Sequence, residues 1–167
     1  MAMMLRGESD ALVVIGWREW VCLPNLGIAT LKAKVDTGAR TSALHAFGLE
    51  RVESSEPHGP QRIRFQVHPH QRDDAVSVSA EADLVDERLV RSSSGVAELR
   101  PVVRTLVELG GEAFEAEFTL TDRALLGFRM LLGREALRRR FIVDPGCSYR
   151  GGGRRASFVR PREQRTT

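Results

Sequence analysis

The sequence predicts an all-β fold that is mainly strands with one short helix. Apolar and polar residues alternate along runs such as 63–67 and 76–85, and this period of two is typical of half-buried strands. Turn-forming residues at 24–27 and 110–111 separate such runs, as the turns of β-hairpins do. A helix is expected only over residues 135–140. Together these features favour a single β domain.

The first half of the chain is expected to supply a hairpin, a further strand and a polar loop. Leu31, Ala33 and Val35 alternate with Lys32 and Lys34, which indicates a strand with one buried face. In chain order we expect a strand over 12–23 interrupted near Gly16, a turn over 24–27, a return strand over 28–35, a further strand over 39–45 and a polar loop over 50–61.

The second half is expected to consist of hairpins followed by the short helix and a last strand. In chain order we expect a strand over 63–67, a loop over 68–74, strands over 76–85 and 89–91, a flexible tip over 92–95, a strand over 99–109, a glycine turn at 110–111, a partner strand over 113–120, a loop over 121–128, a core strand over 130–132, the helix over 135–140 and a strand over 141–143.

Length and composition are ordinary for one globular domain. The 167 residues are 42% hydrophobic and 28% charged, which suffices for a core without covalent staples. We expect residues 1–10 to be a disordered lead, residues 11–149 to form the domain and residues 150–167, rich in Gly, Arg and Ser, to be a disordered basic tail. No apolar run is long enough to span a membrane, and the apolar run near the N-terminus is too short for a signal peptide.

Cysteine use and charge give further expectations. Cys22 and Cys147 are the two cysteines, and we expect reduced thiols in a cytoplasmic protein, although either could be a buried small hydrophobe without a role. The net charge is +3, both lysines are Lys32 and Lys34, and the other cations are arginines. A GC-rich genome would explain this bias. A requirement for guanidinium groups that bind carboxylates or phosphates would explain it equally well.

The strand over 28–35 runs directly into Asp36-Thr37-Gly38. An Asp-x-Gly triplet after a strand is often only a turn. Followed by Ala39, however, this motif resembles the active site of aspartic proteases, and most closely that of the single-domain retropepsins. A second motif, residues 130–137 (MLLGREAL), resembles the apolar pair, the Gly-Arg and the short helix of the same family.

The resemblance to retropepsins implies an acid-protease fold, a closed β-barrel in which the apolar pair of the second motif packs beneath the aspartate loop. The Ser-rich tip at 92–95 and the hairpin after it resemble the flap, which closes over the peptide and excludes water. In retropepsins the end of the chain joins a sheet that is shared between two protomers.

The resemblance also implies a mechanism. Hydrolysis of an amide without a metal or a nucleophile needs one carboxylate to activate water and one carboxylic acid to polarise the carbonyl, and two carboxyls about 3 Å apart share one proton. Thr37 would brace the loop across this pair, and Gly38 would let the backbone turn beside the carboxylate. Asp-Thr-Gly occurs once in the chain. We therefore expect a C2 homodimer in which Asp36 of each protomer meets its copy on the two-fold axis.

The resemblance extends to a bacterial family. Residues 16–24, 32–46, 68–69 and 131–134 look like a family labelled ATP-dependent zinc proteases, which is associated with RimK-type ATP-grasp glutamate ligases (the RimB type). The match covers about residues 14–149. The association implies that the substrate is the poly-α-glutamate tail that the ligase adds to a small-subunit ribosomal protein, and that this protein trims the tail.

One position departs from the viral enzymes. They carry an Asp after Asp-Thr-Gly-Ala that pairs with the Arg of the Gly-Arg motif, whereas this chain carries Arg40. Arg40 should attract acidic side chains, which leaves Arg134 to pair with Glu135 or another acid, or to face substrate. The residues expected to bind substrate are Ala39, Arg40, Thr41, Arg88, Arg91, Ser93, Ser94, Gly95, Arg104, Arg129 and Arg134. For each arginine except Arg40, a solvated surface side chain is the leading alternative.

No metal and no cofactor are expected. His68 and His70 would share a face of a strand, and His45 and His58 could join them, but no His-Glu-x-x-His and no cysteine pair with ligand spacing is present. We expect His68 to orient a loop. The chain also lacks a Gly-x-x-x-x-Gly-Lys-Ser/Thr loop, so ATP would belong to the ligase.

Two other functions stay open at this point. A catalytically silent module that binds the ribosome or nucleic acid would agree with the basic tail and the sequence pI near 9.4. The aromatic content of 6% and the intact Asp-Thr-Gly argue against direct binding of nucleic acid as the function. A general cytoplasmic peptidase that cuts apolar sites is the third interpretation, and a panel of acidic and apolar peptides would separate it from the first.

Overall fold

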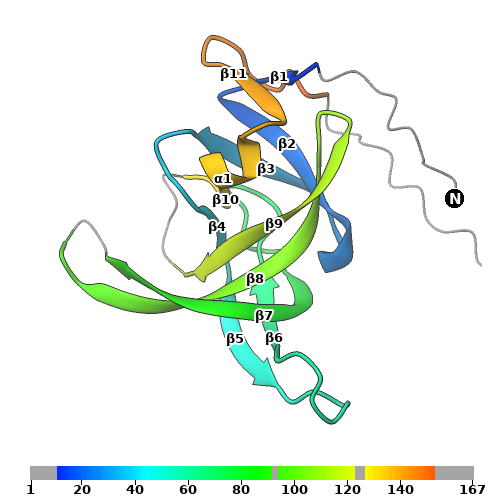
Figure 1. Cartoon of the computed structure of the whole chain (residues 1–167), viewed down its shortest axis with the longest axis vertical. Helices are drawn as coiled ribbons and strands as arrows, with labels where there is room; N and C mark the ends of the chain where they lie inside the picture. Colours follow the sequence, from blue (N-terminus) through cyan, green and yellow to red (C-terminus); the bar gives the residue numbers. More distant parts are fainter. Residues whose placement is uncertain (1–10, 92–93, 123–126, 153–167) are drawn as a thin grey trace, which may run out of the picture.

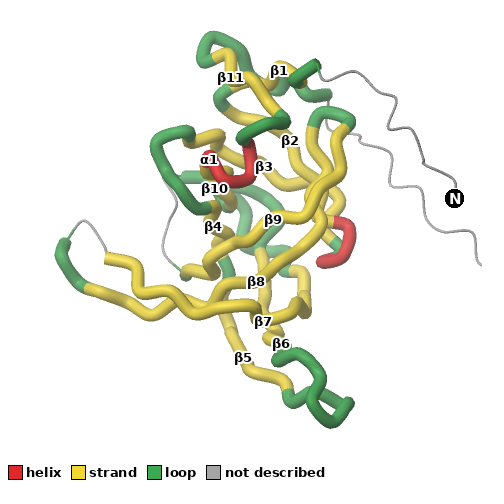
Figure 2. The backbone as a smooth tube through the Cα atoms, viewed as in Figure 1, coloured by secondary structure: helices red, strands yellow, loops and turns green. Residues whose placement is uncertain are grey.

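The structure is a computed structural model that describes residues 11–91, 94–122 and 127–152. The described chain is mostly strand, with one short α-helix and one 3-10 turn (Figure 2). This confirms the predicted all-β class. The predicted lead over 1–10, the part of the predicted tail over 153–167, and Ser93 in the predicted tip lie outside the described residues. Among the described residues, no helix has the length and apolarity needed to cross a bilayer.

The elements follow one another in the order shown in Figure 1. They are β1 (Val13–Gly16), β2 (Arg18–Leu23), η1 (Pro24–Leu26), β3 (Ile28–Asp36), β4 (Ser42–His45), β5 (Phe47–Val52), β6 (Arg62–Val67), β7 (Val78–Arg91), β8 (Ala97–Leu109), β9 (Glu112–Thr121), β10 (Met130–Gly133), α1 (Arg134–Leu137) and β11 (Phe141–Asp144).

Six strands close a barrel in the order β2, β3, β10, β4, β9, β8. The ring closes where Cys22 of β2 pairs with Glu108 of β8. Most neighbours are antiparallel, but β10 runs parallel to β3, and β4 runs parallel to β9. The closed barrel expected from the resemblance is therefore confirmed, and the two sequence motifs lie on neighbouring strands.

The core lies inside the barrel and follows from the alternation of side chains along its strands. On β3 the predicted apolar residues Leu31, Ala33 and Val35 are at most 7% exposed. On β10, Met130 and Leu132 are fully buried beside them. Burying an aliphatic side chain of this size stabilises the fold by roughly 1.5–3 kcal/mol, so this packing fixes the strands that carry the motifs.

The sheet continues beyond the barrel through β7, β6 and β5. In Figure 1 the hairpin of β7 and β8 projects away from the barrel, and the hairpin of β5 and β6 extends from its lower end. The predicted polar loop over 50–61 was placed too early, because residues 50–52 belong to β5. This strand has exposed residues between its two half-buried ends, so its sequence resembles a loop.

Other boundaries also differ from the prediction, and the strand expected over 39–45 begins only at Ser42. β7 is continuous, because a bulge between Leu84 and Asp86 absorbs the break in alternation that suggested two strands. The helix spans Arg134–Leu137 and does not reach residue 140. It ends because Arg138 has an extended ψ of 141° and Arg139 has a positive φ of 64°.

The last strand, β11, pairs with β1 of the same chain in a separate parallel sheet. This small sheet lies at the top of the molecule in Figure 1. Ile142 of β11 is 51% exposed and Leu12, just before β1, is 43% exposed. The expected sheet shared between two protomers stays a prediction.

Candidate functional site

Asp36 is the last residue of β3, and its carboxylate is held by the turn that follows. The backbone N–H groups of Gly38 and Ala39 donate to Oδ1 of Asp36 at 3.1 and 3.2 Å. A Cβ on Gly38 would lie 3.3 Å from the same oxygen, so glycine leaves room for the carboxylate. Within the described residues Oδ2 accepts no hydrogen bond. The turn therefore fixes the carboxylate and leaves one oxygen available.

Thr37 lies at the exposed tip of this turn. Its hydroxyl makes no hydrogen bond with any described residue of the chain. The predicted bracing contact across the aspartate pair would require a second protomer, and the single chain leaves the hydroxyl accessible to one.

The Gly-Arg motif packs directly against the aspartate turn. Gly133 pairs with Asp36 in the register of β10 and β3. Its N–H donates to the buried Oγ of Ser42 at 3.0 Å. A Cβ on Gly133 would lie 2.6 Å from the carbonyl of Thr41, so only glycine allows this approach. The two motifs thus form one compact unit.

The start of α1 continues this contact. The N–H of Arg134 donates to the carbonyl of Ala39 at 2.9 Å, and the N–H of Glu135 donates to that of Arg40 at 3.1 Å. The guanidinium of Arg134 donates to the carbonyl of Gly38 at 3.1 Å. Glu135, one of the expected partners of Arg134, pairs instead with Arg40 at 3.6 Å, and Arg134 supports the aspartate turn.

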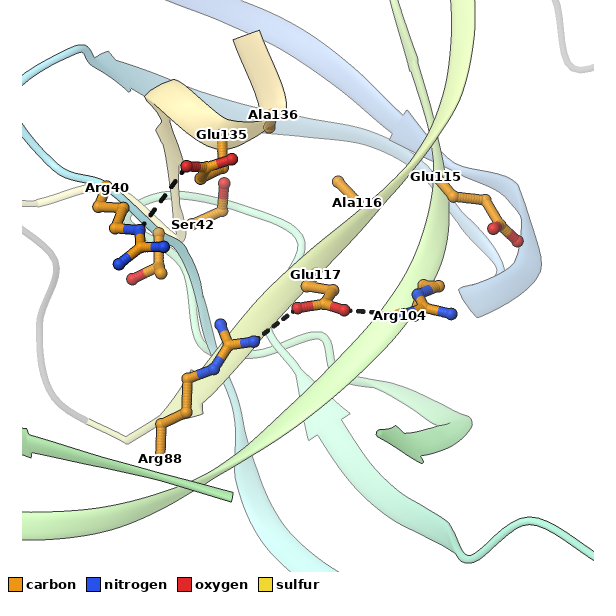
Figure 3. Close-up of a pocket in the computed structure, with 10 residues that line it drawn as sticks. Arg40, Ser42, Arg88, Arg104, Glu115, Ala116, Glu117, Glu135 and Ala136 are labelled. Carbon is orange, nitrogen blue, oxygen red and sulfur yellow. Dashed lines mark hydrogen bonds and ion pairs between the residues drawn. The ribbon is translucent and has the colours of Figure 1, made fainter. Parts of the chain in front are cut away.

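A groove of about 590 Å³ lies beside this unit, between α1 and strands β4 and β9 (Figure 3). Arg88 from β7 and Arg104 from β8 reach one carboxylate, that of Glu117, at 2.7 and 2.8 Å. Hydrogen bonds from Arg104 and then Arg88 hold the pKa of Glu117 below its usual range. Arg88 also contacts Asp86 at 3.0 Å.

The charges of this groove are balanced. Its lining contains the arginines at 40, 88 and 104 and the glutamates at 115, 117 and 135. Three of the six predicted arginines therefore lie together in this groove. Each is paired with an acid of the same chain. Sequence reasoning missed Glu117 and Ser42, because their roles depend on the register between strands.

The other predicted substrate-binding residues are more dispersed. Thr41 lines the groove, and Ala39 lies in the aspartate turn. Arg91, Ser94 and Gly95 lie at the exposed end of the hairpin of β7 and β8, where Gly95 has a φ of 83°.

Arg129 lies elsewhere and is only 14% exposed. Its guanidinium pairs with Asp74 and donates to the carbonyl of His70 at 3.1 Å. It holds the loop after β6 and does not line the groove.

The aromatic rings of two histidines and a phenylalanine lie close together near β4 and β6. His68 stacks on Phe47 at 4.5 Å and approaches His45 at 6.3 Å. A ring nitrogen of His68 contacts the carbonyl of Val76 at 3.1 Å, as expected for a loop-orienting residue. Burial and the nearby Arg129 lower the pKa of His45. In the part of the chain that the structure describes, no three His, Cys, Asp or Glu side chains are grouped to hold a metal.

Comparisons with known proteins identify related sequences. A family model described as RimB-like, retropepsin-like aspartic endopeptidase RimB, matches residues 14–151. A probable alpha-L-glutamate ligase of Shewanella pealeana is 41% identical over 84% of this chain. Another, of Parasynechococcus marenigrum, is 44% identical over 84% of this chain. The chain spans only 30% and 29% of the lengths of these two relatives.

A solved structure shares the fold. The crystal structure of a protein of unknown function from Legionella pneumophila has a TM-score of 0.68 with this chain at 27% identity. The similarity covers 84% of this chain and 99% of that one. The fold of this chain therefore recurs in another protein.

Proposed function

This chain belongs to the RimB-like family of retropepsin-like aspartic endopeptidases, and on that premise we propose that it hydrolyses glutamate-rich peptide chains as a homodimer. The observation that carries the proposal is the aspartate turn. Asp36 is fixed at the end of β3 by two backbone N–H groups, and the Gly-Arg motif packs against it.

In the proposed mechanism the two Asp36 carboxyls of the dimer share one proton and hold one water molecule. The ionised carboxylate removes a proton from the water as its oxygen attacks the peptide carbonyl. The protonated partner donates its proton to the carbonyl oxygen, which gives a tetrahedral intermediate. A proton then passes to the nitrogen as the C–N bond breaks, so the amine leaves and the other product carries a carboxyl group. The N–H groups of Gly38 and Ala39 keep each carboxylate oriented during these steps.

The dimer is supported by the single catalytic aspartate that each chain supplies. Asp-Thr-Gly occurs once in the sequence, and the mechanism requires two carboxyls. Asp36 is only half-buried, and Thr37 and Gly38 are exposed at the tip of the turn. A second copy packed tip to tip would complete the site.

The substrate class is supported by the relatives. Proteins named probable alpha-L-glutamate ligase contain a segment about 41% identical to this chain. A ligase that joins glutamates and a peptidase that separates them act on the same acidic chain, so we propose a functional link between them. Poly-α-glutamate tails on a ribosomal protein are the specific substrate that this link suggests.

Incubation with an oligo-α-glutamate peptide, followed by mass spectrometry, tests the proposal. We expect products shortened by whole glutamate residues, and no products with Asp36→Asn. A neutral apolar peptide of equal length is the matched substrate. Cleavage of the apolar peptide alone would indicate a general endopeptidase. Failure to cleave either peptide at acidic and at neutral pH would overturn the proposal.

A further inference from the structure

A second groove, separate from the one beside α1, lies over β2, β3 and the loop after β6. Its lining includes Arg18 and Trp20 from β2, Lys32 from β3, and His70 and Arg72 from the loop. Its volume is about 660 Å³. It therefore has room for several residues of an extended peptide.

The charge of this second groove is not balanced. Three cations, Arg18, Lys32 and Arg72, line it, and its lining contains no carboxylate. None of the three forms an ion pair with any described residue. The nearby acids are engaged elsewhere, since Asp74 pairs with Arg129 and Asp73 accepts the N–H of Ala75 at 2.8 Å. The groove beside α1, in contrast, holds its arginines in ion pairs with its own glutamates.

Aromatic rings order two of these cations. The guanidinium of Arg18 lies 4.7 Å from the ring centre of Trp17 and 5.0 Å from that of Tyr149. The ammonium of Lys32 lies 5.2 Å from the ring centre of Trp20. Such cation–π contacts restrict the side chains without neutralising them, so they remain able to bind an anion at a lower entropic cost.

The register of β3 connects this groove to Asp36. Lys32, Lys34 and Asp36 occupy alternate positions of a regular strand and therefore share one face. Arg18 is directly opposite Lys34 on β2. At about 3.3 Å per residue, Lys32 lies roughly 13 Å along the strand from Asp36. That distance equals about four residues of extended peptide.

We propose that this groove, built around Arg18, Lys32 and Arg72, binds the glutamate side chains of an acidic peptide whose scissile bond lies at Asp36. This assignment rests on the proposed function for the choice of substrate. An acidic peptide fits better than nucleic acid, because Trp20 and Tyr149 stack on each other at 5.4 Å and carry cations on their rings. They therefore offer little open ring face for bases.

Binding is measured with the full chain carrying Asp36→Asn, so that the probe is not cleaved. The probe is a fluorescein-labelled oligo-α-glutamate peptide, followed by anisotropy at low and moderate salt. Lys32→Gln with Arg72→Gln removes two groove cations, and we expect binding about tenfold weaker with a smaller salt dependence. Arg51→Gln with Arg64→Gln removes the same charge from the hairpin of β5 and β6, and we expect less than about a twofold change.

The same pairs of substitutions in the active background separate this inference from the proposed function. We expect the groove variant to raise KM about tenfold with little change in kcat. Cleavage by the wild type with an unchanged KM in the groove variant would overturn the groove assignment and leave the function standing. Loss of peptide binding in the groove variant, with no cleavage by the wild type, would do the reverse.

Nucleic acid is tested with a labelled oligouridine of matched charge. If it binds more tightly than the glutamate peptide and the groove variant loses that binding, the groove is a nucleic-acid site and our assignment is wrong. Equal loss with the Arg51 and Arg64 control would show only a response to net charge, which also overturns it. Unchanged thermal unfolding of each variant confirms that the comparison is made between folded proteins.

Discussion

Asp36 lies directly opposite Gly133 across the parallel strands β3 and β10. The residues are far apart in the sequence, yet the pairing of two short strands brings the aspartate turn and the Gly-Arg motif into contact. The backbone of α1 then donates to the carbonyls of Ala39 and Arg40. The position of the carboxylate therefore depends on how closely these two backbones approach.

Gly133→Ala tests that close approach. The new Cβ would lie 2.6 Å from the backbone of Thr41, and backbone atoms cannot move aside as a flexible side chain could. We expect the free energy of unfolding to fall by about 2–3 kcal/mol, measured by urea denaturation. Gly146→Ala is the control, because its Cβ would meet only the Asp144 carboxylate at 3.3 Å. Equal stability of the two variants would contradict the argument.

Asp36→Asn should abolish hydrolysis and preserve the fold. The amide oxygen of Asn can still accept the N–H groups of Gly38 and Ala39, so the turn should persist. Asn cannot exchange the proton that the mechanism moves, and we expect turnover to fall at least about a thousandfold. Peptide assays and thermal unfolding on the same sample measure both effects. Retained turnover in a well-folded variant would exclude Asp36 as the catalytic acid and base.

Mixing wild-type protein with Asp36→Asn tests whether two protomers form one site. If each site needs two aspartates, mixed dimers are inactive. Equal amounts of the two chains should leave about one quarter of the dimers active, against about one half of the protein for independent monomers. The mixture is measured against wild type diluted with buffer alone. Activity that follows the wild-type fraction linearly would show that one chain is sufficient.

The sequence predicted the strands and the aspartate turn because both depend on local patterns, whereas the closed barrel was expected from the resemblance to retropepsins. Alternation along β3 sets which residues are buried, and Asp-Thr-Gly sets a turn that its own backbone closes. The bounds of β5 and β7 were harder to predict. An exposed polar strand resembles a loop, and a bulge resembles a break between strands.

The partners of the arginines could not be predicted, because they depend on register between strands distant in sequence. Arg104 is directly opposite Glu117 on β9, and Arg88 reaches the same carboxylate from β7. The positions of the arginines in the sequence do not show which acids lie opposite them. The second groove could not be predicted for the same reason. It forms only because β2 pairs with β3 and the loop after β6 lies beside them.

Glu19→Gln tests a buried carboxylate that joins β2 to the chain after β11. Glu19 is fully buried and accepts N–H groups from Gly16, Arg150 and Gly151 at 2.6, 2.8 and 3.1 Å. Gln would turn an NH₂ group toward one of these donors. We expect a loss of about 2–4 kcal/mol in unfolding free energy, and faster hydrogen exchange at Arg150 and Gly151. Exposed Glu112→Gln is the control, and equal effects of both substitutions would contradict this role.

Glu117→Gln should change stability in a pH-dependent way. Hydrogen bonds from Arg104 and Arg88 lower the pKa of Glu117 in the folded protein. A carboxyl of this kind stabilises the fold above its unfolded pKa, about 4.3, and the stabilisation is lost as pH falls through the folded pKa. Because the side chain is 34% exposed, we expect a loss of only about 1 kcal/mol at neutral pH. The wild type and the variant should converge in urea denaturation below about pH 4. Glu112→Gln is the control, and its stability relative to the wild type should not change with pH in this way. If the stability difference between Glu117→Gln and the wild type stays constant or grows in acid, the ionised carboxylate does not stabilise the arginine pair.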